Sequence, residues 1–192
     1  MRKRNRYTIT NIYRKNDLTN AQIVEVSLED YDELFNGWDA SLLKRKELEP
    51  ELMDYLLASS REIPFNENLE LEFYVPSSKK NSEKELRSLE GIKYNFKVGL
   101  HFVQQALSAN TRKILTYIAI SIGFLLLAYL LPTVSDLGIM FSILMEGLFI
   151  GGWVMLWEAF SLFFFASHEL RVKRKHLIRL LESELSIIYQ NV

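Results

Sequence analysis

The sequence predicts an α+β cytoplasmic domain fused to an α-helical two-span transmembrane hairpin, and three observations carry this prediction. Residues 1–110 are rich in charge and contain short apolar stretches that alternate with polar residues. Residues 114–166 contain no Lys, Arg or His, and their acids are Asp136, Glu146 and Glu158. Basic residues flank this apolar region on both sides. We therefore divide the chain into three parts, namely a cytoplasmic α/β domain, 1–110, a transmembrane hairpin, 111–167, and a cytoplasmic C-terminal helix that a last strand could follow, 168–192.

Two segments of the apolar region are each long enough to cross a membrane. The first span, about 114–131, has no charge, and a helix of this length rises about 27 Å, close to the thickness of a hydrocarbon core. Pro132 ends it, because proline cannot continue the helical hydrogen-bond ladder. The second apolar segment, 139–166, is long enough to span with tilt, with its span at about 143–166. Both segments could instead be the core of a soluble protein, but their basic flanks favour the membrane.

The orientation of the hairpin follows from its basic residues. Arg112 and Lys113 precede the first span, and the loop between the spans has no Lys or Arg. A basic cluster follows the second span, namely Arg171, Lys173, Arg174, Lys175 and Arg179. By the positive-inside rule, both termini then face the cytoplasm. The cluster after the second span would meet anionic lipid at the membrane surface.

The cytoplasmic part combines strands and helices. Residues 7–13 and 21–27 are predicted strands joined by a polar turn, 14–20. A helix is expected from Pro50, since proline suits a first turn. Residues 69–75 alternate between apolar and polar, which is typical of a half-buried strand.

A second cytoplasmic helix is expected to start at Ser82, because Ser82–Glu85 has the capping-box pattern. Its apolar positions allow it to run without a break into the first span and to transmit movement there. It could equally do no more than pack on the sheet. After the second span we expect a helix over 168–185, with 186–189 adding a last strand.

Several classes of function are disfavoured by composition. The net charge is −1 and the pI about 6.3, so no basic footprint indicates direct binding of DNA or RNA. The chain has no cysteine, which excludes disulfides and thiolate chemistry. Its three histidines lack the spacing of a zinc site, and neither a glycine-rich phosphate loop nor a nucleophile elbow is present. We therefore expect no enzyme, with no catalytic residue, cofactor or metal.

The second span contains an unusual stripe. Spacings of three and four residues place six residues on one helical face, namely Gly147, Gly151, Val154, Glu158, Ser161 and Phe165. Two glycines four apart allow another backbone to approach closely. An ionised carboxylate would be costly in lipid, so Glu158 should face protein or water.

Oligomerisation would give these carboxylates such an environment. Several copies could gather the stripe around an axis, and rings of acidic side chains select cations in many pores. The predicted pore residues are Glu146, Glu158 and Ser161, and the predicted helix-packing residues are Gly147, Gly151, Trp153 and Trp157. Two alternatives stay open. Glu158 could be neutral and hydrogen-bonded to Ser161, Tyr117 or Ser121 of a neighbouring helix, and Glu146 could lie among the outer headgroups.

One segment of the cytoplasmic part is a candidate ligand site. The basic run Lys44, Arg45 and Lys46 follows shortly after Trp38. Such a run could bind an anion, or a nucleotide whose base stacks on the indole. A solvated basic face is the simpler interpretation.

Three stretches together resemble a known layout, namely FNGWDASLLKRKELEPELMDYLL (35–57), LELEFYVP (69–76) and GLFIGGWVMLWEAFSLFFF (147–165). They resemble small bacterial membrane proteins with a cytosolic α/β domain and a two-helix hairpin. Within that group the layout is similar to the membrane effector of Hailong-type antiphage defence. There, a partner nucleotidyltransferase makes a cyclic oligonucleotide, and the effector is an oligomeric channel that opens in response.

The resemblance implies a homo-oligomeric ion channel in the lipid bilayer, gated by a cytosolic signal such as a cyclic oligonucleotide. It also implies a nucleotidyltransferase encoded alongside. The alternative function is a non-channel membrane anchor or scaffold that recruits or restrains a cytosolic partner.

Overall fold

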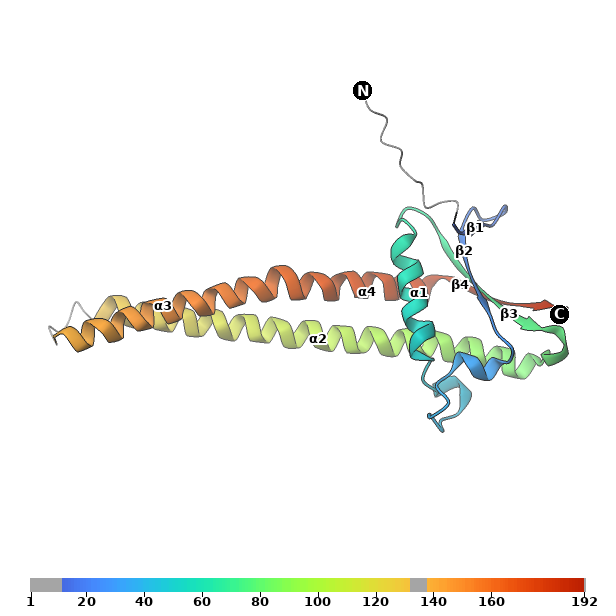
Figure 1. Cartoon of the computed structure of the whole chain (residues 1–192), viewed down its shortest axis with the longest axis horizontal. Coiled ribbons are helices and arrows are strands. Elements are labelled where there is room, and N and C mark those ends of the chain that lie inside the picture. The colour runs from blue at the N-terminus through green and yellow to red at the C-terminus, as the bar shows by residue number, and fades with distance from the viewer. Residues whose placement is uncertain (1–11, 132–137, 192) are drawn as a thin grey trace, which may run out of the picture. The chain divides into compact units, whose positions relative to one another are not determined.

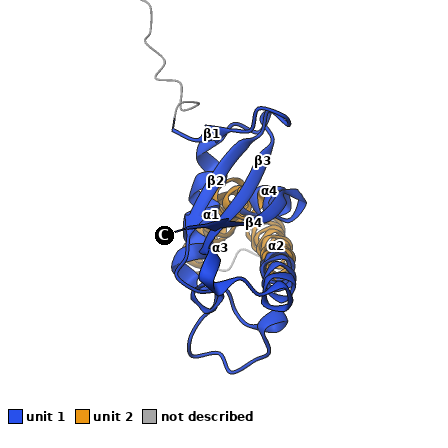
Figure 2. Ribbon diagram, turned by 90° about the vertical axis from the view of Figure 1, so that its right-hand side faces the viewer, with its two compact units in different colours: residues 1–101, 173–192 blue, residues 102–172 orange. Residues whose placement is uncertain are grey.

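The computed structural model describes residues 12–131 and 138–191, and it divides into two compact units (Figures 1 and 2). The first unit comprises Met1–His101 and Lys173–Val192, and the second comprises Phe102–Val172. The first contains a mixed sheet with helices, and the second is helical. A sheet-and-helix unit together with long apolar helices is the coarse arrangement that the sequence predicts.

The sheet of the first unit has four strands in the order β1-β2-β3-β4. Their bounds are Arg14–Lys15 for β1, Gln22–Ser27 for β2, Leu69–Pro76 for β3 and Glu184–Gln190 for β4. β1 is antiparallel to β2, whereas β2, β3 and β4 are mutually parallel. The chain between β3 and β4 includes the whole second unit, so the apolar hairpin is inserted between two neighbouring parallel strands.

The predicted strands can be compared with these bounds. β2 and β3 confirm two of them, and β4 confirms the last strand and is longer than expected. β1 lies inside the segment that the sequence assigned to a turn, so that assignment was wrong at Arg14 and Lys15. Both residues are exposed and the strand is two residues long, which leaves no alternation to detect. The predicted strand at 7–13 falls largely outside the described residues.

Burial alternates along β3, and this alternation defines the core of the first unit. Leu69, Leu71, Phe73 and Val75 are buried, whereas the residues between them are half-buried. The register pairs Val24 of β2 with Leu71, and Ile187 of β4 with Phe73. Helical residues complete the core, namely Leu56, Leu57, Ile92, Phe96, Leu177 and Leu180.

Helix α1 (Pro50–Glu62) begins with proline at its first turn, as the sequence predicts. Three short 3-10 helices lie in the loops of the first unit, namely η2 (Tyr31–Leu34), η3 (Leu43–Arg45) and η4 (Ser77–Lys79). Helix α4 (Ser167–Glu182) ends three residues before the expected boundary, because the chain turns there into β4.

Helix α2 (Ser82–Leu130) is one helix of 49 residues, which bears out the prediction that it runs without a break into the first apolar segment. Its start differs from the predicted capping box. The side chain of Asn81 accepts hydrogen bonds from the backbone N–H groups of Glu83 and Lys84, at 3.1 and 3.0 Å. Asn81 is therefore the N-cap residue, and the cap lies one residue earlier than Ser82.

The second unit contains the C-terminal part of α2 together with α3 (Ile139–Ser161) and a π-helical segment, Leu162–Ala166, which leads into α4. Two continuous helices, Ser82–Leu130 and Ile139–Glu182, are long and apolar enough to cross a membrane, each with a mean hydropathy of 1.9 over its most apolar 18 residues. Only 6% and 11% of those windows are buried. A helix in the core of a soluble protein would be mostly buried instead.

Candidate functional site

Helices α2 and α3 are in close contact at Gly152. A Cβ atom there would lie 2.8 Å from Cγ of Leu125, so no larger residue fits without a shift. The hydroxyl of Ser121 donates a hydrogen bond to the carbonyl of Gly152 at 2.7 Å. Met145 and Ala159, each seven residues from Gly152, are also buried. These residues form the face of α3 that packs within the chain.

The predicted packing residues lie on other faces of α3. A Cβ atom on Gly147 would have no atom within 4 Å, and one on Gly151 would touch only the ring of Phe124, at 3.4 Å. Trp153 and Trp157 are exposed, with 54% and 75% of their surface accessible. Sequence reasoning identified a glycine stripe but missed Gly152, since the residue immediately beside Gly151 gives no separate signal.

The two carboxylates of the apolar segment are exposed. Neither Glu146 nor Glu158 has a hydrogen-bond or ion-pair partner among the residues that the structure describes. Ser161, the third predicted pore residue, is half-buried. The hydroxyl of Ser121, a proposed partner of Glu158, bonds to the Gly152 carbonyl of its own chain instead. Within the part of the chain that the structure describes, no side chain therefore compensates either acid.

Helical geometry separates the two carboxylates. Twelve residues at about 100° each put Glu146 and Glu158 about 120° apart around α3 and about 18 Å apart along it. Measured from Gly152, the two acids lie about 120° to opposite sides of the intrachain contact. Glu146 also lines a shallow hollow of about 360 Å³ with Ala128, Met145, Phe149 and Ile150. The two acids thus belong to different surfaces of the hairpin.

A polar cluster lies at the π-helical segment. The carbonyl of Leu162 accepts hydrogen bonds from the Asn110 side-chain amide at 3.2 Å and from the Ser167 hydroxyl at 3.0 Å. The same amide also donates to the Ser167 hydroxyl at 2.8 Å, and both polar residues are buried. A π-helix displaces backbone hydrogen bonds, and such segments are frequent at functional sites. The backbone N–H of Ser167 also bonds to the Leu162 carbonyl, so one backbone donor and two side-chain donors converge on it.

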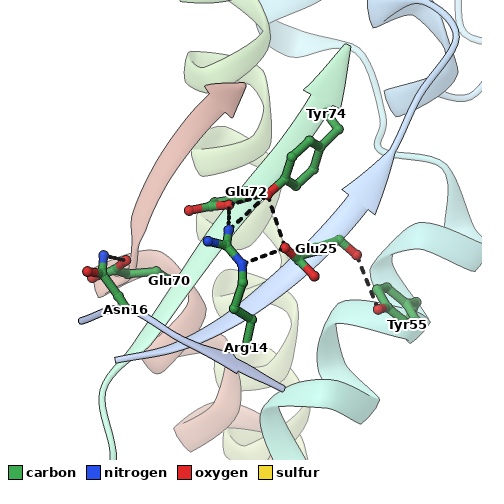
Figure 3. Close-up of polar contacts among 7 residues, drawn as sticks. All are labelled: Arg14, Asn16, Glu25, Tyr55, Glu70, Glu72 and Tyr74. Atoms are coloured by element: carbon green, nitrogen blue, oxygen red, sulfur yellow. Dashed lines mark hydrogen bonds and ion pairs between the residues drawn. The ribbon is translucent and has the colours of Figure 1, made fainter. Parts of the chain in front are cut away.

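The outer face of the sheet in the first unit carries a compact polar cluster (Figure 3). The guanidinium of Arg14 donates to Glu25 at 2.8 Å and to Glu72, and to the hydroxyl of Tyr74 at 2.8 Å. Tyr74 can donate in turn to either carboxylate, at 3.0 and 2.7 Å. Burial and these two hydrogen bonds raise the pKa of Tyr74 above its ordinary value. Every member is satisfied inside the cluster, which favours a structural role.

Arg179 has a role that differs from the predicted contact with lipid. Its guanidinium donates four hydrogen bonds to backbone carbonyls in the last turn of α1 and just after it, at distances of 2.6 to 3.0 Å, and the acceptors are Ser60, Ile63, Pro64 and Glu67. It also lies over the ring of Phe65, 5.4 Å from its centre. Arg179 therefore joins α4 to the end of α1 inside the first unit.

The predicted ligand residues lie in the loop that precedes α1. Trp38 is 96% exposed, and Lys44 and Arg45 are exposed on η3. The carbonyl of Lys46 accepts a hydrogen bond from the side chain of Asn95 at 2.7 Å. Asp39 accepts bonds from the backbone N–H groups of Ser41 and Glu47, at 2.9 and 2.7 Å, and its pKa is lowered by them. The loop is held in shape, and its indole and basic side chains project from it.

Among residues 12–131 and 138–191, no three His, Asp or Glu side chains gather in a way that could hold a metal ion. Comparison with protein-family models, with curated proteins and with solved structures finds no match. The functional argument therefore depends on the chemistry of the sites themselves, above all on the two unpartnered carboxylates of the apolar hairpin.

Proposed function

We propose that this chain is a homo-oligomeric ion channel of the bacterial inner membrane, with both termini in the cytoplasm, gated by a cytosolic signal. The observation that carries this proposal is the pair of exposed carboxylates, Glu146 and Glu158, on a helix that is otherwise apolar. Lipid cannot stabilise an ionised carboxylate, and residues 12–131 and 138–191 of a single copy offer neither acid a partner. Further copies or a water-filled path would meet that need.

The polar surface of α3 suits a path for cations. With α2 on the outside, the face of α3 opposite Gly152 points to the axis of the ring, and Ser161 lies on that face. Glu158 lies on the shoulder beside it, near the cytoplasmic end of the span. A ring of such carboxylates raises the local concentration of cations. Glu146 forms a second acidic level about 18 Å away, near the outer mouth.

The signal is proposed to be a cyclic oligonucleotide made by a nucleotidyltransferase, on the strength of the sequence resemblance. The projecting Trp38 with Lys44 and Arg45 has the chemistry to bind it, since an indole stacks on bases and basic side chains pair with phosphates. Binding would shift a closed–open equilibrium by its differential affinity for the two states. The continuous helix α2 is the covalent connection between the first unit and the span.

The test is single-channel recording of the full-length protein in planar bilayers, with cyclic oligonucleotides added on the cytosolic side. We expect discrete currents on addition, and in Glu158→Gln a severalfold loss of preference for cations over anions. Glu169→Gln is the matched control, since this exposed carboxylate on α4 lies outside the apolar segment.

Silence from a folded preparation under all ligands would overturn the channel and favour the membrane anchor or scaffold. If Glu158→Gln abolished assembly while the control assembled normally, Glu158 would be a structural hydrogen-bonding residue between helices rather than part of a path for ions.

A further inference from the structure

The exposed surface of α3 has two unlike flanks on either side of the intrachain contact at Gly152. At about 100° per residue, one flank collects small residues and a carboxylate, and we call it the small flank: Gly147, Gly151, Val154 and Glu158. The other collects aromatic rings and a carboxylate, and we call it the aromatic flank: Glu146, Phe149, Trp153 and Trp157. The two flanks lie roughly 100–160° and 60–140° from Gly152, on opposite sides.

The aromatic flank is a ridge of large side chains spaced four residues apart. Phe149 and Trp153 meet edge to face, with their ring centres 6.5 Å apart, so Trp153 is supported by its own helix. Trp157 continues the row and is the most exposed of the three. Rows of this spacing are the ridges that enter grooves when helices pack.

The small flank has the shape of the matching groove. Gly147 has open space where a side chain would be, and Gly151 meets only Phe124 of α2. Val154 adds a short side chain, and Glu158 lies at the inner end of the groove. Glycine at these positions lets a neighbouring helix approach closely enough for a ridge to enter.

Hydrogen-bonding groups on the two flanks are also complementary. If all copies have the same orientation, a given residue lies at the same depth in the membrane in each of them. Trp157 of one copy then lies within about 1.5 Å of the depth of Glu158 in the next copy. The indole N–H only donates, and a carboxylate accepts. When the aromatic flank of one copy packs on the small flank of the next, the Trp157 indole can therefore donate to Glu158. The described residues of its own chain offer Glu158 no such donor.

We infer that the aromatic flank of α3 in one copy packs into the small flank of the next copy, with Trp157 donating to Glu158 across the interface. Such a contact is heterologous, since two different surfaces meet, and a repeated heterologous contact forms a ring when the rotation between successive copies closes. The inference rests on the proposed function in one respect, namely that all copies have the same orientation in the membrane. It places Glu158 at the interface between two neighbouring subunits, next to the axis of the ring.

Cysteine cross-linking tests this arrangement cleanly, because the natural chain has no cysteine. Glu146→Cys places a thiol on the aromatic flank, and Gly147→Cys places one on the small flank at nearly the same depth; both leave the tryptophan ridge intact. The two full-length variants, carrying different tags, are produced separately and together in membranes and then oxidised. We expect a disulfide-linked dimer only when they are mixed. Self-linking of either variant alone would show that like flanks meet, and would overturn the inference.

A second pair of variants tests the fit of the groove. Gly147→Ile fills the small flank, and Gly123→Ile is the matched control on α2, since both glycines have open space around them within the chain. In lipid nanodiscs we expect Gly147→Ile to lose the oligomer seen for the natural protein and Gly123→Ile to retain it. Equal assembly of the two variants would overturn the inference. If Trp157→Phe kept both the oligomer and the cross-link between unlike flanks, the indole bond to Glu158 would be excluded.

These outcomes are separable from those of the channel proposal. Cross-links between unlike flanks without any current would support the interface and overturn the pore. Currents from a protein whose like flanks cross-link would support the pore and overturn the interface.

Discussion

The two units of this protein treat their polar groups in opposite ways. In the first unit, Arg179 satisfies four backbone carbonyls and Asn95 bonds to Lys46, Leu48 and Gly91, so side chains of one element complete the backbone of another. In the second unit, Glu146 and Glu158 face outward without a partner among the described residues. These groups of the first unit find their partners within one copy. Under the proposed function, the two carboxylates of the second unit find theirs in further copies or in water.

Removing the polar connection in the first unit should have the largest effect on stability. Arg179→Ala deletes a charged donor and leaves four carbonyls without their partner, which should lower the free energy of unfolding of this unit by about 3 kcal/mol. Native-state hydrogen exchange of the full-length protein in nanodiscs measures this as a loss of protection of about 100-fold in β3 and α1. Arg174→Ala, an exposed neighbour on α4, is the control. Unchanged protection would mean that the unit is not held together by this residue.

Disrupting the contact at Gly152 in the second unit should have the next-largest effect on stability. Gly152→Ala puts a methyl group 2.8 Å from Cγ of Leu125, so α2 and α3 must separate, at a cost of about 2 kcal/mol. Gly123→Ala, which meets no atom within 4 Å, should be neutral. Unfolding in SDS, followed by the emission of Trp153 and Trp157, gives the comparison. If both variants unfolded alike, the hairpin would not depend on the contact at Gly152.

Much of the fold could be predicted from the sequence because its signals are local. The alternation of residues 69–75, the proline at position 50 and the uncharged run at 114–131 each report the environment of their own element. The start of α2 was missed by one residue, since Asn81 and Ser82 are both good N-caps and only the hydrogen bonds distinguish them.

The candidate sites were less predictable because they depend on pairs of distant residues. Arg179 was one of several basic residues after the second span, and nothing local marks it as the partner of residues 60–67. Asn110 and Ser167 lie 57 residues apart, so neither position indicates the cluster at Leu162. The stripe containing Gly147 and Glu158 was visible, but which small residue faces the chain's own helix depends on how α2 and α3 pack.

A pH titration sharpens the comparison of the two units, because His176, a buried titratable residue of the first unit, can be replaced on its own. Burial, with the charges of Arg61 and Arg179, lowers the pKa of His176 below its usual 6.5, and its Nδ1 lies 3.0 Å from the Ser60 hydroxyl. The unfolded chain therefore binds this proton more readily than the folded one. Stability should be full above pH 6.5 and fall as the pH drops below it, by about 1.4 kcal/mol per pH unit at most.

The variant His176→Gln should remove this dependence, whereas His168→Gln, an exposed residue on the same helix, should retain it. Hydrogen exchange of β3 and α1 between pH 5 and pH 7.5, corrected for the intrinsic rate, measures both. A natural protein whose stability is constant over that range would show that His176 is equally accessible to protons in the folded state.

The smallest expected effect concerns the cluster at the π-helical segment, where side chains from two helical turns far apart in sequence bond to a backbone group of the second unit. Asn110→Ala removes one of two side-chain donors to the Leu162 carbonyl, and hydrogen bonds between apolar helices contribute only about 0.6 kcal/mol on average. Amides over 162–167 should exchange about threefold faster. Thr111→Val is the control, since that hydroxyl bonds within its own helix. A much larger change would show that Asn110 holds the π-helix against conversion to a regular α-helix, which would rotate every residue of α3 relative to α4 by about 100°. Such a rotation would turn the whole small flank of α3, Glu158 included, about the helix axis, and it would connect the cluster directly to the opening of the proposed pore.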